Sequence, residues 1–367
     1  MIGLYEIWQR KTQFGLIALI VTLISYLILM VTGLGLGLNE LAGSALRSFN
    51  ADAIAYSDEA GISVIRSELS EETVERIRNA EGVTDSASLG YVAANYLDSD
   101  GEIASAAFLG YDPGTIGEPK VTSGDTLTPG DRLGLLADKR FLSASGLDVG
   151  DTVTVSLRLS KHEFRIVGEI DEGAFFFQPA VYVLRSTWQE LRYGSIGGEL
   201  PAASIVLLKG NGLAGREGPG YEIVNKATAF ANIEGVAGQN STVQSLRAAA
   251  FVIGALVIGV FFYVLTLQKV PQIGVLKAIG ASNAFVFRQI VVQVLTLSAA
   301  GIAIAMPMAW LTEWALAQSP DSLPIAFSTG TYVTTAIGLV VTAVVGALFS
   351  GRQVLKTDPI IALGQQQ

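Results

Sequence analysis

Charged side chains are rare in the apolar parts of this sequence, and two glutamates stand out there. Glu40 directly follows a long apolar run, and Glu313 lies between Trp310 and Trp314 near the end of another. Ionisable groups at membrane depth are costly, so they are candidates for a functional role. A carboxylate oxygen can ligate a hard cation such as ferric iron, and nearby Arg47 could pair with an anionic group.

The two glutamates are not equal candidates. Tryptophans line membrane–water interfaces, so Glu313 also fits a plain interfacial position, and we prefer Glu40 as the ligand-binding residue. Some other side chains in the apolar runs could contact a ligand, although these types are more often packed: Tyr26, Met30, Met306 and Met308.

The residue types exclude most other chemistry. The chain has no cysteine and one histidine, His162, so no His/Cys metal site or thiol nucleophile can be assembled. No GxxxxGK[ST] motif occurs, which excludes nucleotide hydrolysis by a P-loop. A net charge of -9 without a basic cluster argues against nucleic acid as a partner. An enzyme acting alone is therefore the weakest hypothesis.

Composition places these residues in a membrane protein. Of the 367 residues, 50% are hydrophobic and only 16% are charged, and the mean hydropathy is +0.46. Four apolar runs are long enough to cross a bilayer: residues 14–38, 248–267, 289–312 and 331–350. The first run is too long for the apolar region of a signal peptide, so we expect a retained helix.

Basic residues near the ends of these runs predict the orientation. Seven of them fall on one side of a four-span protein: Arg10, Lys11, Lys269, Lys277, Arg288, Arg352 and Lys356. Because such residues mark the cytoplasmic side, we expect a multi-pass protein of the bacterial cytoplasmic membrane with both termini in the cytoplasm.

The predicted organisation follows from these spans: cytoplasmic N-terminus and first helix, 1–38; extracytoplasmic domain with helical stalk, 39–247; second helix, 248–267; cytoplasmic helix, 268–288; third helix, 289–312; external loop, 313–330; fourth helix, 331–350; cytoplasmic C-terminus, 351–367. The expected fold is α-helical and membrane-embedded, with four transmembrane helices and a large α+β extracytoplasmic domain inserted between the first and second.

Local patterns in the external segment mix helix and strand. The first helix is expected to continue beyond the membrane, through residues 39–57, and another helix starts at Ser70 and ends at Gly82. Residues 152–159 and 163–170 alternate as two hairpin strands. Residues 222–250 are expected to be helical and to lead into the second span.

Three closely spaced glycines end the first apolar run, Gly33, Gly35 and Gly37. They do not follow a soluble strand, so a dinucleotide-binding loop is excluded. Glycines let another backbone approach closely, which predicts that the first helices of two copies meet here in a homodimer. The alternative is that they only loosen the helix end.

A short segment between the second and third spans reads "QKVPQIGVLKAIGAS". It has helical periodicity, with Pro271 suited to the first turn. A helix bearing Ile273, Val275, Leu276 and Ile279 would expose apolar side chains to the cytosol unless a partner covered them. The alternative is a helix that lies on the membrane surface.

This segment resembles the coupling helix of MacB/FtsX-type (type VII) ABC transporter permeases. The similarity lies in Ile273-Gly274, Leu276-Lys277 and the run from Ala278 to Ser282, while Pro271-Gln272 stand where that family commonly has Arg-Glu. The end of the chain, "GRQVLKTDPIIAL", is also similar to the end of these permeases, and so is the layout of one span, a large external domain and three further spans.

The resemblance implies a set of partners. A separate P-loop ATPase subunit, in two copies, would bind ATP and magnesium and contact a homodimer of this chain embedded in membrane lipid. The residues that match the coupling motif, and would meet the ATPase, are Pro271, Ile273, Gly274, Leu276, Lys277, Ile279 and Gly280. No permanently bound cofactor is expected.

Chains of this length without a fused ATPase look most similar to haem-efflux (HrtB-type) and DevC-type permeases, which implies haem as the substrate. Glu40 from each copy would then ligate the haem iron, with Arg47 near a propionate and with Tyr26, Met30 and Glu313 as further contacts. Two alternatives stay open. One is an FtsX-like permease that controls cell-wall hydrolases, and the other is MacB- or LolC-like export of lipoproteins or peptides.

Overall fold

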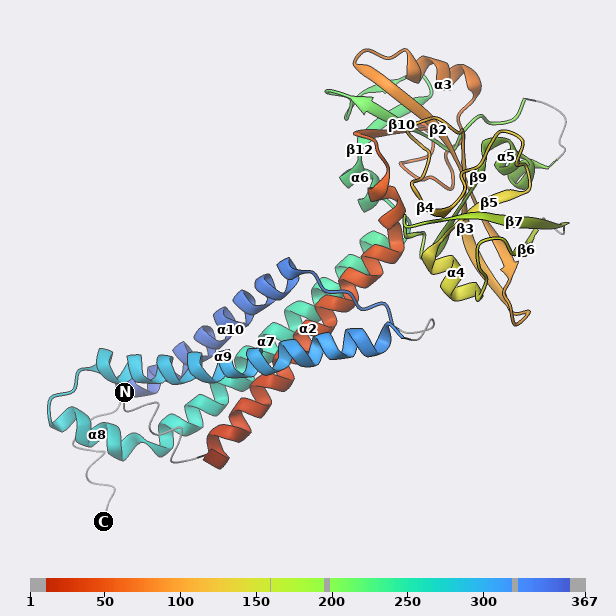
Figure 1. Cartoon of the computed structure of the whole chain (residues 1–367). Helices are drawn as coiled ribbons and strands as arrows, with labels where there is room; N and C mark the ends of the chain where they lie inside the picture. The colour runs from red at the N-terminus through yellow and green to blue at the C-terminus, as the bar shows by residue number, and fades with distance from the viewer. Residues whose placement is uncertain (1–10, 159, 195–198, 319–322, 357–367) are drawn as a thin grey trace. The chain divides into compact units, whose positions relative to one another are not determined.

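The computed structural model describes residues 11–158, 160–194, 199–318 and 323–356. They form two compact units, one within Met1–Gly37 and Asn240–Gln367 and the other within Leu38–Gln239. We call them the membrane unit and the external unit (Figure 1). Arg10, from the predicted orientation, and the Asp358-Pro359 motif lie outside the described residues.

Four helices in the described part of the chain are long and apolar enough to cross a membrane. They are α2 (Lys11–Ser48), α7 (Val236–Gln268), α9 (Asn283–Leu316) and α10 (Thr329–Lys356). A helix covers each of the four predicted spans, and each helix extends past its apolar run. Polar residues thus continue the helices on either side of the apolar stretch, because backbone hydrogen bonding does not depend on hydropathy.

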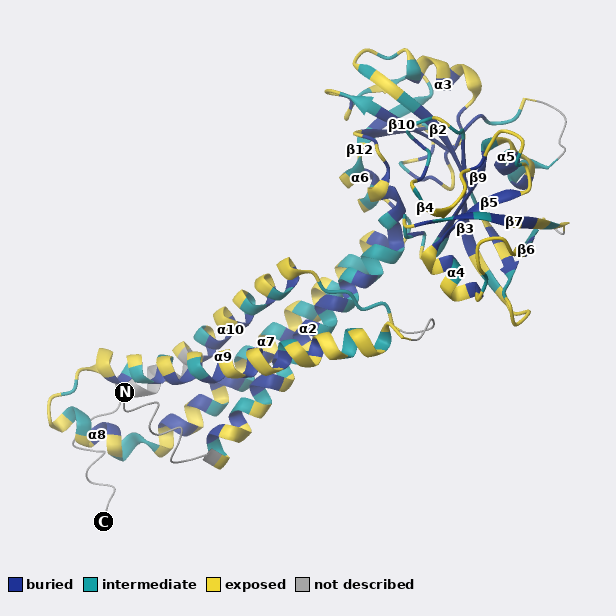
Figure 2. Cartoon of the chain, in the orientation of Figure 1, coloured by how far each residue is buried: buried dark blue, intermediate teal, exposed yellow. Residues whose placement is uncertain are grey.

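One face of α2 forms the core of the membrane unit. Phe14, Ile17 and Val21 are buried against α7 and α9, where Phe262 and Val294 are also buried. Other apolar side chains on the helices of this unit are exposed, and Figure 2 colours the exposed positions of these helices yellow. On α2 they recur at helical spacing: Leu16, Leu19, Leu23 and Leu27. An apolar face of this kind suits contact with lipid.

The external unit is an α+β domain. Its strands are β1 (Ala53–Tyr56), β2 (Val83–Leu97), β3 (Ile103–Tyr111), β4 (Val121–Gly124), β5 (Gly134–Asp138), β6 (Thr152–Leu157), β7 (Ser160–Ile170), β8 (Ala174–Phe175), β9 (Gln178–Leu184), β10 (Ile205–Gly210), β11 (Glu217–Gly218) and β12 (Tyr221–Asn225). Its shorter helices are α3 (Glu71–Arg78), α4 (Lys139–Ser145), α5 (Arg185–Tyr193) and α6 (Lys226–Ala231).

These strands pair in the order β11-β12-β1-β10-β2-β3-β9-β5-β7-β4. Strand β6 pairs with both β2 and β7, so the path β2-β3-β9-β5-β7-β6 closes on itself. Trp188 of α5 packs into the buried cluster of these strands. An added Cβ at Gly90 or Gly110 would collide with Trp188, so both glycines make room for that side chain.

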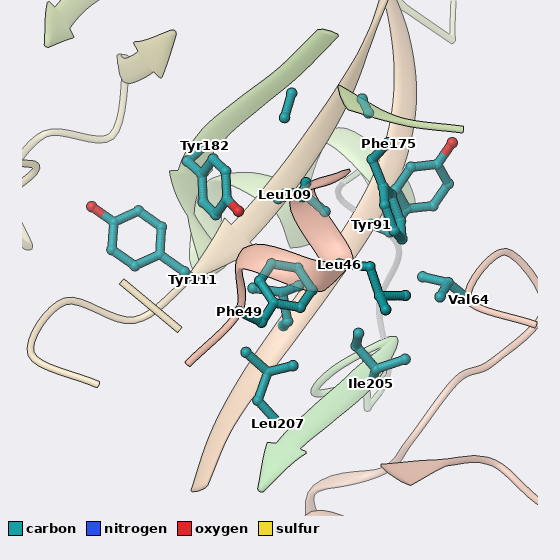
Figure 3. Close-up of a cluster of buried hydrophobic side chains, with 14 of the residues drawn as sticks. Leu46, Phe49, Val64, Tyr91, Leu109, Tyr111, Phe175, Tyr182, Ile205 and Leu207 are labelled. Carbon is teal, nitrogen blue, oxygen red and sulfur yellow. The ribbon is translucent and has the colours of Figure 1, made fainter. Parts of the chain in front are cut away.

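The outer end of α2 belongs to the core of the external unit. Leu46 and Phe49 are buried in one cluster with Leu109, Ile205 and Leu207, and Figure 3 shows them from three parts of the chain. The last turns of α2 are therefore fixed by the sheet rather than by helix propensity.

A kink in α2 is held by the β8–β9 hairpin. Gly43 leaves the helical conformation, and the carbonyls of Leu41 and Ala42 accept hydrogen bonds from the amides of Phe177 (2.8 Å) and Phe176 (3.0 Å). Both phenylalanines have positive φ, 63° and 51°. A type I′ hairpin requires positive φ at its two central residues, but bulky side chains rarely adopt it. The turn is strained where it binds α2.

Several local expectations need correction. The helix after Ser70 starts as predicted, and the Ser70 hydroxyl accepts from the Thr73 amide. It ends at Arg78 rather than at Gly82, which has positive φ and lies directly before β2. Residues 53–56 and 222–225 were expected in helices and instead pair as β1 and β12. The hairpin of β6 and β7 is confirmed.

Candidate coupling helix and substrate-binding residues

The segment between the second and third spans forms a short helix, α8 (Val270–Ala278), with Pro271 in its first turn. Ile273 is 5% exposed and lies in one buried cluster with Phe14, Phe262 and Val286. It anchors α8 to the other helices of the membrane unit. Ile273 and Gly274 are both buried, so the exposure expected of Ile273 is not observed, and an ATPase contact at these two residues stays a prediction.

The end of α8 explains the Ala-Ile-Gly-Ala-Ser run. Gly280 has φ +100°, its amide donates to the Lys277 carbonyl (3.0 Å), and the Ala281 amide donates to the Leu276 carbonyl (2.9 Å). This pair of bonds is a Schellman motif, which favours glycine at the left-handed position. Ser282 immediately caps α9 by accepting from the Phe285 amide. Helices α8 and α9 are thus joined by a short, hydrogen-bonded connection.

The opposite side of α8 is apolar and open to solvent. Val275, Ala278 and Ile279 are exposed, and Ile279 is 77% exposed. Their spacing places them on one helical face. Leu276 and Lys277 are half-buried beside them. We call Val275, Ala278 and Ile279 the α8 patch. No described part of the chain covers the apolar surface of these three side chains.

The space beside the three glycines of α2 is filled by other residues of the same chain. An added Cβ would lie 2.5 Å from the Phe327 ring at Gly33 and 2.6 Å from Val243 at Gly35. At Gly37 it would collide with the Pro324 carbonyl. Close packing at these positions was expected, but the observed neighbours are α7 and the loop before α10. A homodimer contact at these glycines stays a prediction.

Tyr26, Met30 and Met306 pack in one apolar cluster of the membrane unit that also holds Phe327. The Tyr26 hydroxyl lies 2.9 Å from the Thr312 hydroxyl. Met308, in contrast, is exposed.

Glu313 accepts a hydrogen bond from the Phe327 amide (3.0 Å). Its carboxylate therefore fixes the loop before α10. Tyr26, Met30 and Glu313 are brought together around this loop, each with a packing or hydrogen-bonding partner of its own.

Glu40 and Arg47 lie in the external unit. The Glu40 carboxylate pairs with Arg140 of α4 at 3.7 Å, and both side chains are about half exposed. The Arg47 guanidinium donates to the Asn39 carbonyl (2.9 Å) and lies 4.7 Å from the centre of the Phe230 ring. An exposed ion pair contributes little stability, so Glu40 can exchange Arg140 for another partner at small cost.

Asp138 links α4, whose Arg140 pairs with Glu40, to the segment just before the β8–β9 hairpin. Its carboxylate caps α4 by accepting from the Arg140 amide (2.9 Å) and accepts from the Glu172 and Gly173 amides ahead of β8. Burial raises the pKa of Asp138, and the three backbone donors oppose that shift. Nothing in its sequence position marks this residue.

In the residue ranges that the structure describes, no group of three or more His, Cys, Asp or Glu side chains could hold a metal ion. His162 lies in β7, with its ring centre 6.4 Å from that of Phe164. An iron ligand set built on Glu40 thus needs a second copy of the chain or donors from the ligand.

Comparison with known proteins assigns the class. Residues 246–359 match the FtsX-like permease C-terminal family. The chain is 25% identical over 361 residues, 98% of its length and 97% of that protein, to the "Putative hemin transport system permease protein HrtB" of Staphylococcus haemolyticus. It is 24% identical over 367 residues, 99% of this chain and 98% of that protein, to an uncharacterized ABC transporter permease of Mycobacterium tuberculosis.

Among solved structures, the extracellular domain of the noncanonic ABC-type transporter YknZ from Gram-positive bacteria overlaps 48% of this chain and 100% of its own, with a TM-score of 0.34 and 16% identity.

Four apolar helices with a large α+β domain between the first and second define a multi-pass membrane protein with a large outside domain. The FtsX-like match covers the second to fourth of these helices together with α8. The chain is thus similar to ABC transporter permeases over nearly its whole length, and its C-terminal part matches the FtsX-like permease family.

Proposed function

We propose that this chain is the permease subunit of an ABC-type efflux transporter and works as a homodimer with two copies of a separate P-loop ATPase. The carrying observation is the α8 patch, an exposed apolar face on a helix that is anchored from behind by Ile273. A groove on an ATPase would cover this patch. In this arrangement α8 faces the bacterial cytoplasm and the external unit lies outside.

The geometry of α8 suits the transmission of movement. Ile273 ties α8 to α2, α7 and α9, and the Schellman motif at Gly280 leads directly into the cap of α9. A push on the α8 patch would therefore move the membrane helices rather than bend a loop. ATP and magnesium would be bound by the ATPase, and no residue of this chain takes part in hydrolysis.

We further propose haem as the substrate. The full-length relative named for hemin transport supports this choice, and Glu40 supplies an accessible carboxylate held only by a weak pair with Arg140. In a homodimer Glu40 occurs twice, and two carboxylates can ligate ferric iron. Arg47 keeps further N–H donors beyond the one given to Asn39, and these could bind a propionate.

The test is haem binding by the purified permease in complex with its ATPase. Glu40→Ala should remove the haem absorbance band and leave cells haem-sensitive. Glu313→Ala should keep the band, because Glu313 is committed to the Phe327 amide. Arg140→Ala is the matched control, since it frees Glu40 without removing it and should leave haem binding intact. An unchanged spectrum in Glu40→Ala would overturn the site, and a wild-type complex that binds no haem would overturn the substrate.

A further inference from the structure

A cleft of about 310 Å³ lies between α7 and α10 in the membrane unit. Its lining residues are Gln244, Arg247, Ala248, Phe251, Thr334, Thr335 and Gly338. Arg247 directly precedes the second apolar run, and Thr335 lies within the first two turns of α10. The cleft is therefore near the membrane-entry ends of both helices.

Three of its side chains have donors without partners. Among the residues that the structure describes, none accepts a hydrogen bond from the side chains of Gln244, Arg247 or Thr335. Thr335 is only 5% exposed. Neighbouring Thr334 instead donates to the Gly330 carbonyl one turn back, as helical threonines commonly do. An unpartnered hydroxyl that lines a cleft beside an arginine indicates a place for an acceptor.

The charge of Arg247 is also uncompensated. Neither α7 nor α10 contains an aspartate or glutamate, and no described carboxylate pairs with Arg247. A half-buried guanidinium at the edge of a membrane span is costly without a counter-charge. The missing group is an anion with several acceptor oxygens, which a guanidinium can bind in bidentate fashion.

The rest of the cleft and its surroundings are apolar. Ala248, Phe251 and Gly338 complete the lining, and the same helices expose Val252, Ile337 and Val341. A volume of about 310 Å³ is at the small end of ligand pockets, enough for a headgroup but not for a flat macrocycle with its side chains. The occupant thus combines a compact anionic head with hydrocarbon that lies along α7 and α10.

We propose that this cleft binds the phosphate of an anionic membrane lipid, through the Arg247 guanidinium with support from Gln244 and Thr335. The site is independent of what the permease transports. It makes Arg247 a lipid-binding residue rather than a general membrane anchor, and it predicts preference for phosphatidylglycerol over a zwitterionic lipid.

The test uses the full-length protein in detergent, with native mass spectrometry of retained lipid during titration with phosphatidylglycerol or phosphatidylcholine. Wild type should retain phosphatidylglycerol preferentially. Arg247→Gln should weaken that retention about tenfold, because it removes a charge-assisted contact. Thr335→Val, which keeps the shape of the side chain, should weaken it about threefold. Arg288→Gln is the matched control, since Arg288 is exposed on α9 outside the cleft, and it should change nothing.

Four results would overturn the assignment. Equal retention of the two lipids would show that no anionic site exists. Unchanged lipid retention in both Arg247→Gln and Thr335→Val would show that the lipid binds elsewhere. This conclusion would hold even if one variant were less stable than wild type. Displacement of lipid by excess inorganic phosphate would identify a site for a free anion, and loss of haem absorbance instead of lipid in Arg247→Gln would assign the cleft to the substrate.

Discussion

Ile279 offers a direct measurement of the proposed ATPase contact. Its side chain is 77% exposed at the end of α8, so its truncation removes little from the permease's own packing. Full burial of an isoleucine contributes about 1.5–3 kcal/mol. If the ATPase groove covers Ile279, the Ile279→Ala variant should lose about 2 kcal/mol of binding free energy, a roughly thirtyfold higher Kd.

The assay is interferometry with the permease held in nanodiscs and the ATPase subunit titrated as the soluble partner. Ile304→Ala is the matched control, because Ile304 is also an exposed isoleucine, at 51%, but lies within the third apolar span on α9. Ile273→Ala provides a contrast. It should lower the free energy of unfolding by about 2–5 kcal/mol, since Ile273 is a core residue.

The refuting result is specific. A Kd for Ile279→Ala within twofold of wild type, with Ile304→Ala equally unchanged, would mean that the ATPase does not cover the α8 patch. The α8 patch would then fit a helix lying on the membrane surface, and the exposed isoleucine would face lipid headgroups.

Three further substitutions, together with Gly15→Ala as a control, test the packing. Gly280→Ala should cost about 1 kcal/mol of stability, because alanine is strained at φ +100°, and thermal unfolding would detect it. Gly37→Ala should lower the unfolding temperature of the full chain, because an added Cβ meets the Pro324 backbone. Gly15→Ala should be neutral or mildly stabilising, since nothing lies within 4 Å of its added Cβ. Equal shifts of the unfolding temperature in the two variants would contradict the close approach at Gly37. Phe177→Gly should raise the unfolding temperature by relieving a positive φ, and a lower value would show that the phenylalanine ring contributes more than its backbone strain costs.

Local sequence signals located the helices better than the strands. The four long apolar runs were sufficient to predict the four long helices, and the capping residue Ser70 was sufficient to predict the start of α3. Residues 53–56 and 222–225 are short runs whose apolar pattern fits either helix or strand. Their strand conformation is decided by pairing of β1 with β12 and β10, and no local signal carries that information.

The candidate sites show the same limit. The sequence located α8 but could not tell Ile273 from Ile279, because the difference lies in contact with Phe14 and Phe262, far along the chain. The cleft between α7 and α10 was missed. Its one local signal is Arg247, a basic residue on a helix without acids, and Thr335 joins it only through helix packing.

The junction of α8 and α9 sets a limit on chain length. Ile279, Gly280 and Ala281 are all that separate the last residue of α8 from the cap of α9 at Ser282. One inserted residue would disrupt this short connection, because the Gly280 and Ala281 amides already form the Schellman bonds and the Ile279 amide donates to the Val275 carbonyl. Insertions should be tolerated in the exposed turn at residues 99–101, between β2 and β3. A single codon added between 279 and 282 should instead uncouple the proposed ATPase from the membrane helices while leaving the permease folded.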